Sequence, residues 1–317
     1  MTARRHSRNS WQAGSVALCL LPSYLLFSSL VFCASDGFER LAYCVDQKDR
    51  ACVLACLKEA PANRSPEYFA LAARAYMLVG QNQDAIESIG RAIELKPGSY
   101  DYLMEQGWLY QRSGEQVSAV HSFLLASQIN PQSPSVFYEL GMSFFFAQEY
   151  DRSMRHFEHV LQLDPKNDKA EFMLGVVEIW KGGTEEARGY FVNALNLKPN
   201  NAHYLLHYGV LLANLGENDL ALKNLLAARR LDPSNPLTHY QIGKRYRALG
   251  KFTDAREELE TALRLRPTLS PALFQLGAVY RQLGEEAEAR EAFKKFEVLA
   301  RREKTEKEDP IDANLEE

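Results

Sequence analysis

The chain has 317 residues, of which 46% are hydrophobic, 25% charged and 11% aromatic, and its formal net charge is −4. This composition is that of a folded protein and excludes a chain that is disordered throughout. Residues 1–35 contain three arginines and no acidic residue, so the net charge changes from −4 to −7 when they are removed. A surplus of negative charge disfavours nucleic acid as a partner.

Residues 1–35 have the composition of an export segment. Arg4, Arg5 and Arg8 precede a stretch without any charged residue, whose apolar centre lies at 13–32. A cationic start followed by an apolar stretch is typical of a secretory signal peptide. The apolar stretch is also nearly long enough to span a bilayer, so a retained N-terminal membrane anchor is the alternative. Either reading predicts that the rest of the chain is exported, and is periplasmic or anchored facing the extracytoplasmic side.

Residues 36–65 are predicted to form a degenerate helical hairpin that caps the N-terminal end of the fold, with its turn at 46–49. Cys44 and Cys52 lie at equal distances from the middle of this turn. They can therefore face each other, and an oxidising compartment would permit a disulfide between them. Cys56 is left over. The alternative is that all three are small buried hydrophobic residues, and the absence of any Cys-x-x-Cys motif argues against a zinc or haem site.

A period of 34 residues organises the chain from residue 66 onward. Proline recurs at this spacing at Pro97, Pro131, Pro165, Pro199, Pro233 and Pro267. Residues that can cap the start of a helix recur in the same period at Ser65, Ser99, Ser133, Asn167, Asn201 and Asn235. Each period is therefore predicted to open with a capped helix and to end at a proline that stops the preceding one.

Each period also contains two positions with small side chains, twelve residues apart. The first set is Ala73, Gly107, Gly141, Gly175, Gly209, Gly243 and Gly277, and the second is Ala85, Ala119, Ser153, Ala187, Ala221, Ala255 and Ala289. Small residues allow two antiparallel helices to approach closely. Between the two positions a glycine can form the turn that closes the first helix, except in the third period, where Gln148 stands.

The pattern resembles the tetratricopeptide repeat (TPR). The family signature is matched well at Leu140-Gly141, at Leu276-Gly277 with Tyr280, and at Ala289 and Phe293. Seven repeats cover residues 66–303 and begin at Pro66, Tyr100, Pro134, Asp168, Ala202, Pro236 and Ser270. The resemblance implies an all-α fold, a right-handed α-solenoid of helix-turn-helix repeats. The last helix is expected to end near Lys304, and residues 304–317 are predicted to be a disordered charged tail.

The resemblance also implies where a partner would bind. TPR domains present the second, fifth, ninth and twelfth residues of each repeat on a concave face. Here these positions are Met104, Trp108, Tyr138, Met142, Phe145, Phe172, Val176, Ile179, Leu206, Val210, Tyr240, Lys244, Arg247, Phe274 and Arg281. They are apolar in the middle and basic toward the C-terminal end, which favours an amphipathic helix or extended peptide with acidic groups at that end. The alternative is that these side chains pack on one another in a tight superhelix.

No motif in the sequence predicts catalysis or a cofactor. The chain lacks a Gly-rich phosphate loop, a G-x-S-x-G motif and an H-E-x-x-H motif. His203 and His207 have a spacing that can bind metal, but the motif supplies no third ligand, so no metal site is predicted. His156, His159 and the Glu257-Glu258 pair are expected on solvated helix faces.

The sequence therefore favours a non-catalytic scaffold that binds other proteins or peptides in a TPR groove outside the cytoplasm. Envelope or pilus assembly is suggested by resemblance to similar bacterial TPR proteins. A carrier of a small or sugar-like ligand is the main alternative, because aromatic surfaces also stack on sugars. A metal-dependent activity at His203 and His207 is a second and weaker alternative function.

Overall fold

A computed structural model describes residues 37–59 and 64–308, with side chains up to Arg302. The predicted export segment at 1–35 lies outside the described residues. All regular elements within the described residues are α-helices, which confirms the all-α fold class. They are α2 (Gly37–Asp46), α3 (Arg50–Lys58), α4 (Pro66–Val79), α5 (Asn82–Leu95), α6 (Tyr100–Ser113), α7 (Gln116–Ile129), α8 (Pro134–Phe146), α9 (Tyr150–Leu163), α10 (Asp168–Lys181), α11 (Thr184–Leu197), α12 (Ala202–Asn214), α13 (Asn218–Leu231), α14 (Pro236–Ala248), α15 (Phe252–Leu265), α16 (Ser270–Leu283) and α17 (Glu286–Glu308).

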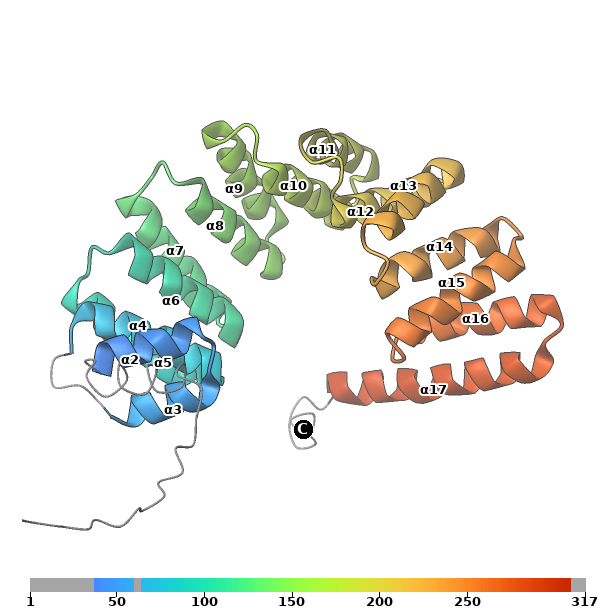
Figure 1. The fold of residues 1–317 in the computed structure, drawn as a ribbon. Coiled ribbons are helices and arrows are strands. Elements are labelled where there is room, and N and C mark those ends of the chain that lie inside the picture. Colours follow the sequence, from blue (N-terminus) through green and yellow to red (C-terminus); the bar gives the residue numbers. More distant parts are fainter. Residues whose placement is uncertain (1–36, 60–63, 309–317) are drawn as a thin grey trace, which may run out of the picture. The chain divides into compact units, whose positions relative to one another are not determined.

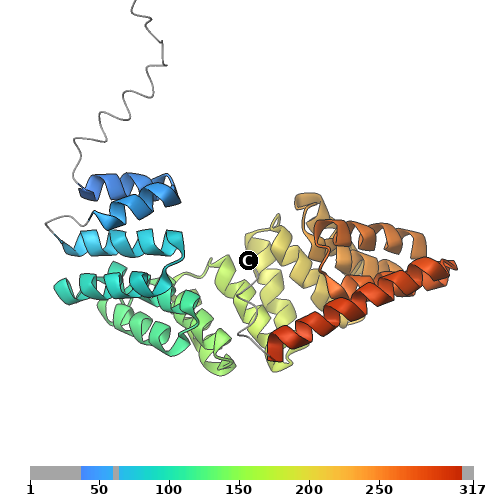
Figure 2. The same cartoon turned by 90° about the horizontal axis from the view of Figure 1, so that it is seen from below.

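The chain forms two compact units, one up to Leu109 and one from Tyr110 onward, so the division falls inside α6. In the first unit, α2 and α3 pack on α4, and α4 pairs with α5. In the second unit, successive helices pair as α8–α9, α10–α11, α12–α13, α14–α15 and α16–α17, and each pair contacts the next. Figures 1 and 2 show these tandem pairs within each unit. No described helix is long and apolar enough to cross a membrane.

The helices begin at the capping residues that recur every 34 residues in the sequence. Asn167, Asn201 and Asn235 accept hydrogen bonds from the backbone N–H groups at the starts of α10, α12 and α14, and Ser65 does so for α4. Such bonds satisfy N–H groups that have no partner within the helix. Ser133 stands at the same position before α8 but makes no side-chain capping bond.

The turns within the pairs also follow the sequence. The glycine of each turn has a positive φ, from 71° at Gly250 to 93° at Gly182. Gln148 takes the same left-handed conformation, with φ of 61°, although a side chain disfavours it by about 1–2 kcal/mol. The turn geometry is therefore kept in the third repeat even where glycine is absent.

A large side chain on the second helix of a pair covers a glycine on the first. In the second unit, Phe157 covers Gly141, Phe191 covers Gly175 and Leu225 covers Gly209. A Cβ atom at Gly141 would lie only 2.7 Å from the Phe157 ring, a distance that real Cβ atoms do not tolerate. The small residues of the 34-residue pattern are therefore required by close helix packing.

Substitution of these glycines should separate crowding from helix propensity. We expect Gly209→Ala to lower the free energy of unfolding by about 1–2 kcal/mol, because its Cβ would meet Leu225 at 2.8 Å and the Ala221 carbonyl oxygen at 3.2 Å. Gly189→Ala in α11 is the control, since no atom lies within 4 Å of its Cβ, and alanine should stabilise that helix by about 0.5–1 kcal/mol. Urea unfolding measures both, and shifts of the same sign would contradict the packing argument.

The last helix is longer than the sequence suggested. α17 ends at Glu308, so the expectation of an end near Lys304 is wrong. Residues 302–308 contain neither glycine nor proline, and the first residue that stops a helix is Pro310. Residues 309–317 of the predicted tail lie outside the described residues.

The N-terminal hairpin consists of α2 and α3. Asp49 caps α3 by accepting hydrogen bonds from the N–H groups of Ala51 and Cys52, at 3.0 and 3.1 Å. Leu41 and Val53 are fully buried in the cluster that joins the hairpin to α4. A disulfide joins Cys44 to Cys52, whereas Cys56 is a buried free thiol.

Candidate partner-binding surface

Five side chains of α8 and α10 form a partly exposed apolar patch in the second unit. These five residues, which we call the apolar patch, are Tyr138, Met142, Phe145, Val176 and Ile179. On each helix they are three or four residues apart, a spacing that places side chains on one face. Their inner sides pack on the core around Phe157 and Leu174, so the core holds the exposed sides in place.

Three residues of the predicted groove are not available to a partner. Met104, Phe172 and Leu206 expose only 2%, 6% and 5% of their surface, so their expected role as contact residues is wrong. Phe172 faces the neighbouring repeat, where it stacks on Tyr204 with ring centroids 4.6 Å apart and planes 17° apart. For Phe172, the alternative of aromatic side chains packing on one another holds.

Two other predicted contact residues are exposed at separate places. Trp108 on α6, in the first unit, exposes 44% of its surface. Phe274 on α16 exposes 47% and packs edge-on against Phe293, at 5.8 Å between ring centroids. Each keeps an aromatic face in contact with solvent.

An aromatic cluster at the edge of the apolar patch was missed by the sequence interpretation. It consists of Phe145, Phe146, Tyr150 and Trp180, and Phe146 and Trp180 expose 56% and 63% of their surfaces. The Tyr150 and Trp180 rings lie 6.4 Å apart and are nearly parallel, and Phe145 meets Trp180 edge-on at 6.3 Å. Phe146 and Trp180 occupy the thirteenth position of successive repeats, outside the four family positions. Their 34-residue separation was the signal that could have revealed them.

A group of cations lies on α14 in the same unit. Lys244 stands over the Tyr240 ring, 5.6 Å from its centroid. Burial lowers the pKa of Lys244, and the positive charges of Arg245 and Arg247 lower it further. Within the described part of the chain no ion pair joins Lys244 or Arg247 to a carboxylate, whereas Arg256 pairs with Glu285 at 2.9 Å. Among the described side chains, positive charge is therefore concentrated at Lys244 and Arg247 without a paired carboxylate.

Arg281 adds a further exposed cation on α16. Its guanidinium lies 5.6 Å from the centroid of the Phe293 ring. Lys244, Arg247 and Arg281 come from two successive first helices, as the repeat positions predict. We call these three residues the basic end.

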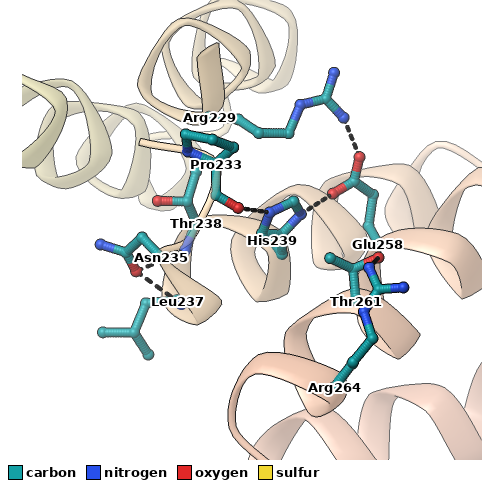
Figure 3. A network of polar contacts seen from close by, with 9 residues as sticks. All are labelled: Arg229, Pro233, Asn235, Leu237, Thr238, His239, Glu258, Thr261 and Arg264. Atoms are coloured by element: carbon teal, nitrogen blue, oxygen red, sulfur yellow. Dashed lines mark hydrogen bonds and ion pairs between the residues drawn. The ribbon is translucent and has the colours of Figure 1, made fainter. Parts of the chain in front are cut away.

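Figure 3 shows a buried polar network in the same region. Glu258 on α15 accepts a hydrogen bond from Arg229 on α13 and lies 2.6 Å from Nδ1 of His239 on α14. The His239 Nε2 donates to the Pro233 carbonyl oxygen at 3.0 Å. Glu258 exposes only 8% of its surface, so its predicted position on a solvated face is wrong. The network links α13, α14 and α15 through side-chain contacts and holds these helices together.

His203 and His207 form an aromatic contact. Their ring centroids are 4.4 Å apart, and both rings lie against Phe172. Burial lowers the pKa of both, to about 4 for His207, where the charge of His203 is a second cause. Neutral rings suit this apolar contact. Among the described residues, only Cys44, Cys52 and Cys56 form a group of three potential metal ligands, so a third ligand is lacking at the histidine pair.

The other histidine pair also differs from the prediction. His156 stacks on Phe144 with ring centroids 5.2 Å apart and nearly parallel planes, and burial lowers its pKa to about 4. His159 meets Phe137 edge-on at 4.2 Å. The expected solvated face is therefore corrected for His156, whereas His159 stays partly exposed and lies 3.1 Å from the Gln162 side chain.

Tandem helix pairs that close on small residues define a repeat protein of the α-solenoid class. Family profiles described as tetratricopeptide repeat match residues 71–134, 134–167 and 181–236, and one described as TPR repeat matches 243–284. The chain belongs to the tetratricopeptide-repeat family, as its sequence pattern predicts. Proteins of this family bind other proteins or peptides. Comparison with curated proteins finds no match.

Solved structures share the fold at low sequence identity. A tetratricopeptide repeat protein from Parabacteroides merdae is 18% identical, with a TM-score of 0.60 over 75% of this chain and 94% of that one. PilF of Pseudomonas aeruginosa is 18% identical, with a TM-score of 0.57 over 65% and 94%. A chain of the Cut9–Hcn1 hetero-tetramer of APC/C is 16% identical, with a TM-score of 0.61 over 87% of this chain and 56% of that one. These similarities establish the fold alone.

Proposed function

We propose that this chain is a non-catalytic scaffold that binds a partner peptide or helix on the first-helix face of its second unit. The observation that carries the proposal is the basic end, where Lys244 and Arg247 are held close together without a carboxylate partner among the described residues. Repelling cations that no internal charge compensates are stabilised when an anionic ligand binds.

The apolar patch supplies the other half of the partner's chemistry. Tyr138, Met142 and Ile179 are fixed by the core yet partly exposed, and rigid apolar side chains of this kind act as anchors at interfaces. The partner is therefore an amphipathic segment with an apolar face and acidic residues toward one end. Exposed Trp180 and Phe146 at the margin would extend the apolar contact.

Charge reversal at the basic end tests this function. We expect Lys244→Glu combined with Arg247→Glu to weaken partner binding by about tenfold or more, because two attractive charges become repulsive. The partner is first captured from the native membrane fraction, identified by mass spectrometry, and then titrated by calorimetry against each variant.

The matched control for this charge reversal is Lys223→Glu combined with Arg230→Glu. Both control residues are exposed on the second helix α13, and the change in net charge is the same. Equal loss of affinity in both double variants would show that net charge alone matters and would reject the basic end as the contact. Circular dichroism of each double variant is the control for correct folding.

We further propose that the protein acts on the extracytoplasmic side, either in the periplasm or attached to the membrane. The cationic and apolar order of residues 1–35 and the disulfide in the hairpin support this location. An assembly role in the envelope or in pilus formation is a narrower proposal that depends on it. Cell fractionation with mass spectrometry of the mature N-terminus tests the location, and recovery among soluble cytoplasmic proteins would contradict it.

A small or sugar-like ligand is the second candidate. The observation in its favour is a hollow beside the aromatic cluster, lined by Tyr150, Asp151, Arg152 and Lys181. Asp151 pairs with Lys181 at 2.9 Å, so this hollow offers fixed polar groups next to the exposed Trp180 face. Titration of a variant with Trp11→Phe and Trp108→Phe, in which Trp180 is the remaining tryptophan, with glycans and with acidic peptides, followed by its fluorescence, separates the two candidates. The metal-dependent alternative at His203 and His207 requires metal that copurifies with the protein.

A further inference from the structure

Three cysteine sulfurs meet between α2 and α3. Cys44 on α2 is bonded to Cys52 on α3. Cys56 lies one turn further along α3, and its Sγ is 3.6 Å from the Sγ of Cys44. All three sulfurs lie within 4.8 Å of one another. The proposed binding of a partner in the second unit makes no use of this cluster.

Cys44 is the common partner of the two cysteines on α3. Residues four apart on a helix share a face, but their Cβ atoms are about 5–6 Å apart. A disulfide requires about 3.8 Å between Cβ atoms, so Cys52 and Cys56 cannot bond to each other while α3 remains helical. Each of them faces Cys44 instead. Two disulfides are therefore compatible with the hairpin: Cys44–Cys52 and Cys44–Cys56.

The two arrangements differ in which thiol is left free. Cys56 is 6% exposed and Cys44 is fully buried, whereas Cys52 is only partly buried. When Cys44 bonds to Cys52, the free thiol is the buried Cys56. When Cys44 bonds to Cys56, the free thiol is Cys52, which reagents in solution can reach. The choice of disulfide therefore decides whether the hairpin presents an accessible thiol.

We propose that the hairpin is a thiol–disulfide exchange site in which Cys56 displaces Cys52 from Cys44 and so exposes Cys52 to a partner's disulfide. The Cys56 thiolate attacks the Sγ of Cys44, the Cys44–Cys52 bond breaks, and its electron pair leaves with Cys52 as a thiolate. One disulfide and one thiol are present before and after the step, so no oxidant or reductant is needed. The proton lost by Cys56 passes to solvent.

The exposed Cys52 thiolate can then attack a disulfide of another molecule. A bond forms between Cys52 and one sulfur of that disulfide, and the other sulfur leaves as a thiolate. The product is a mixed disulfide at Cys52, which again balances without a further reagent. The ligand class is therefore a disulfide-bearing molecule, and the modified residue is Cys52.

The surroundings of Cys56 slow its attack on the disulfide. Burial raises the pKa of the Cys56 thiol, and the nearby Arg40 guanidinium only partly opposes this effect. Arg40 is itself paired with Glu59 at 3.0 Å. Since only the thiolate attacks a disulfide, exchange by Cys56 is slower than by an exposed cysteine.

Oxidised glutathione is the probe for this proposal. The full-length protein, purified without reductant, is incubated with glutathione disulfide at about pH 8, where thiolates are populated. After acid quenching and pepsin digestion, mass spectrometry locates the bonds. We expect glutathione on Cys52 in molecules that contain the Cys44–Cys56 disulfide. Glutathione on Cys56 alone, or no adduct with every molecule in the Cys44–Cys52 form, would overturn the proposal.

Three variants separate exchange from other causes. Cys56→Ala removes the attacking thiol, so Cys52 should stay bonded to Cys44 and take no glutathione. Cys52→Ser should form the Cys44–Cys56 disulfide, and two free thiols after mild oxidation would contradict the geometry. Cys44→Ser should contain no disulfide within the hairpin. Thermal unfolding monitors the fold of each variant. Wild-type protein whose three thiolates hold a copurified metal instead of a disulfide would also overturn the proposal.

Discussion

Glu258→Ala is expected to lower the free energy of unfolding by about 2–4 kcal/mol. The carboxylate lies between Arg229 and His239 and exposes only 8% of its surface. Its removal leaves the buried His239 Nδ1 without its partner and takes the negative charge away from Arg229. Arg229 is more exposed, with 37% of its side chain accessible, so water replaces part of that lost interaction and keeps the effect within this range.

The neighbouring residue provides the control for Glu258. Glu257 stands one position earlier on α15 and is exposed, so Glu257→Ala should change the free energy of unfolding by no more than about 0.5 kcal/mol. Denaturant unfolding followed by circular dichroism measures both variants. Equal and small effects would show that the network of Figure 3 contributes nothing to the packing of α13, α14 and α15.

Phe157→Ala should be more damaging, with an expected loss of about 3–5 kcal/mol. The ring is fully buried, covers Gly141 and meets Tyr138 edge-on at 5.4 Å. Alanine would leave a cavity between α8 and α9 because the helices cannot move together while their other contacts persist. Tyr138 would also lose its support, so binding at the apolar patch should weaken in the folded fraction.

Phe146 is the matched control for Phe157. It is the same residue type on α8, but it exposes 56% of its surface, so Phe146→Ala should alter stability by about 0.5 kcal/mol or less. Unfolding in guanidinium chloride, followed by far-ultraviolet circular dichroism, compares the two. A larger loss from Phe146→Ala than from Phe157→Ala would contradict the assignment of the core.

The patterns that recur every 34 residues predicted most of the fold because each one reflects a requirement of local structure. A helix start needs a capping side chain, and Asn167, Asn201 and Asn235 supply one. A turn that closes a helix needs a left-handed residue, and the glycines supply it. Such requirements repeat whenever the local structure repeats. The extent of α17 was missed because the 34-residue pattern ends with the last repeat, whereas the helix continues through a stretch that contains no helix breaker before Pro310.

Part of the predicted groove was wrong because exposure depends on the neighbouring helices and repeats. Phe172 occupies a family contact position, yet Tyr204 from the next repeat covers it. Glu258 belongs to a charged stretch that resembles an exposed face, yet Arg229 from the preceding repeat and His239 from the first helix of the same repeat enclose its carboxylate. Position within a repeat therefore determines the direction of a side chain, whereas the residues of adjacent repeats determine its accessibility.

The cysteine cluster shows the same division between local and non-local information. Symmetry about the turn singled out Cys44 and Cys52, which are joined in the structure. The closeness of Cys56 to Cys44 depends on how steeply α2 crosses α3, and the spacing in the sequence does not report this angle.

The contact of a bulky side chain with a glycine inside a repeat also bears on how the number of repeats changes during evolution. Leu225 over Gly209 and Leu259 over Gly243 make equivalent contacts in consecutive repeats. Each of these contacts lies within a single repeat, so unequal recombination between two such gene segments would delete or duplicate one block together with its own packing contact. The number of blocks can therefore vary during evolution while the packing inside every remaining block stays intact.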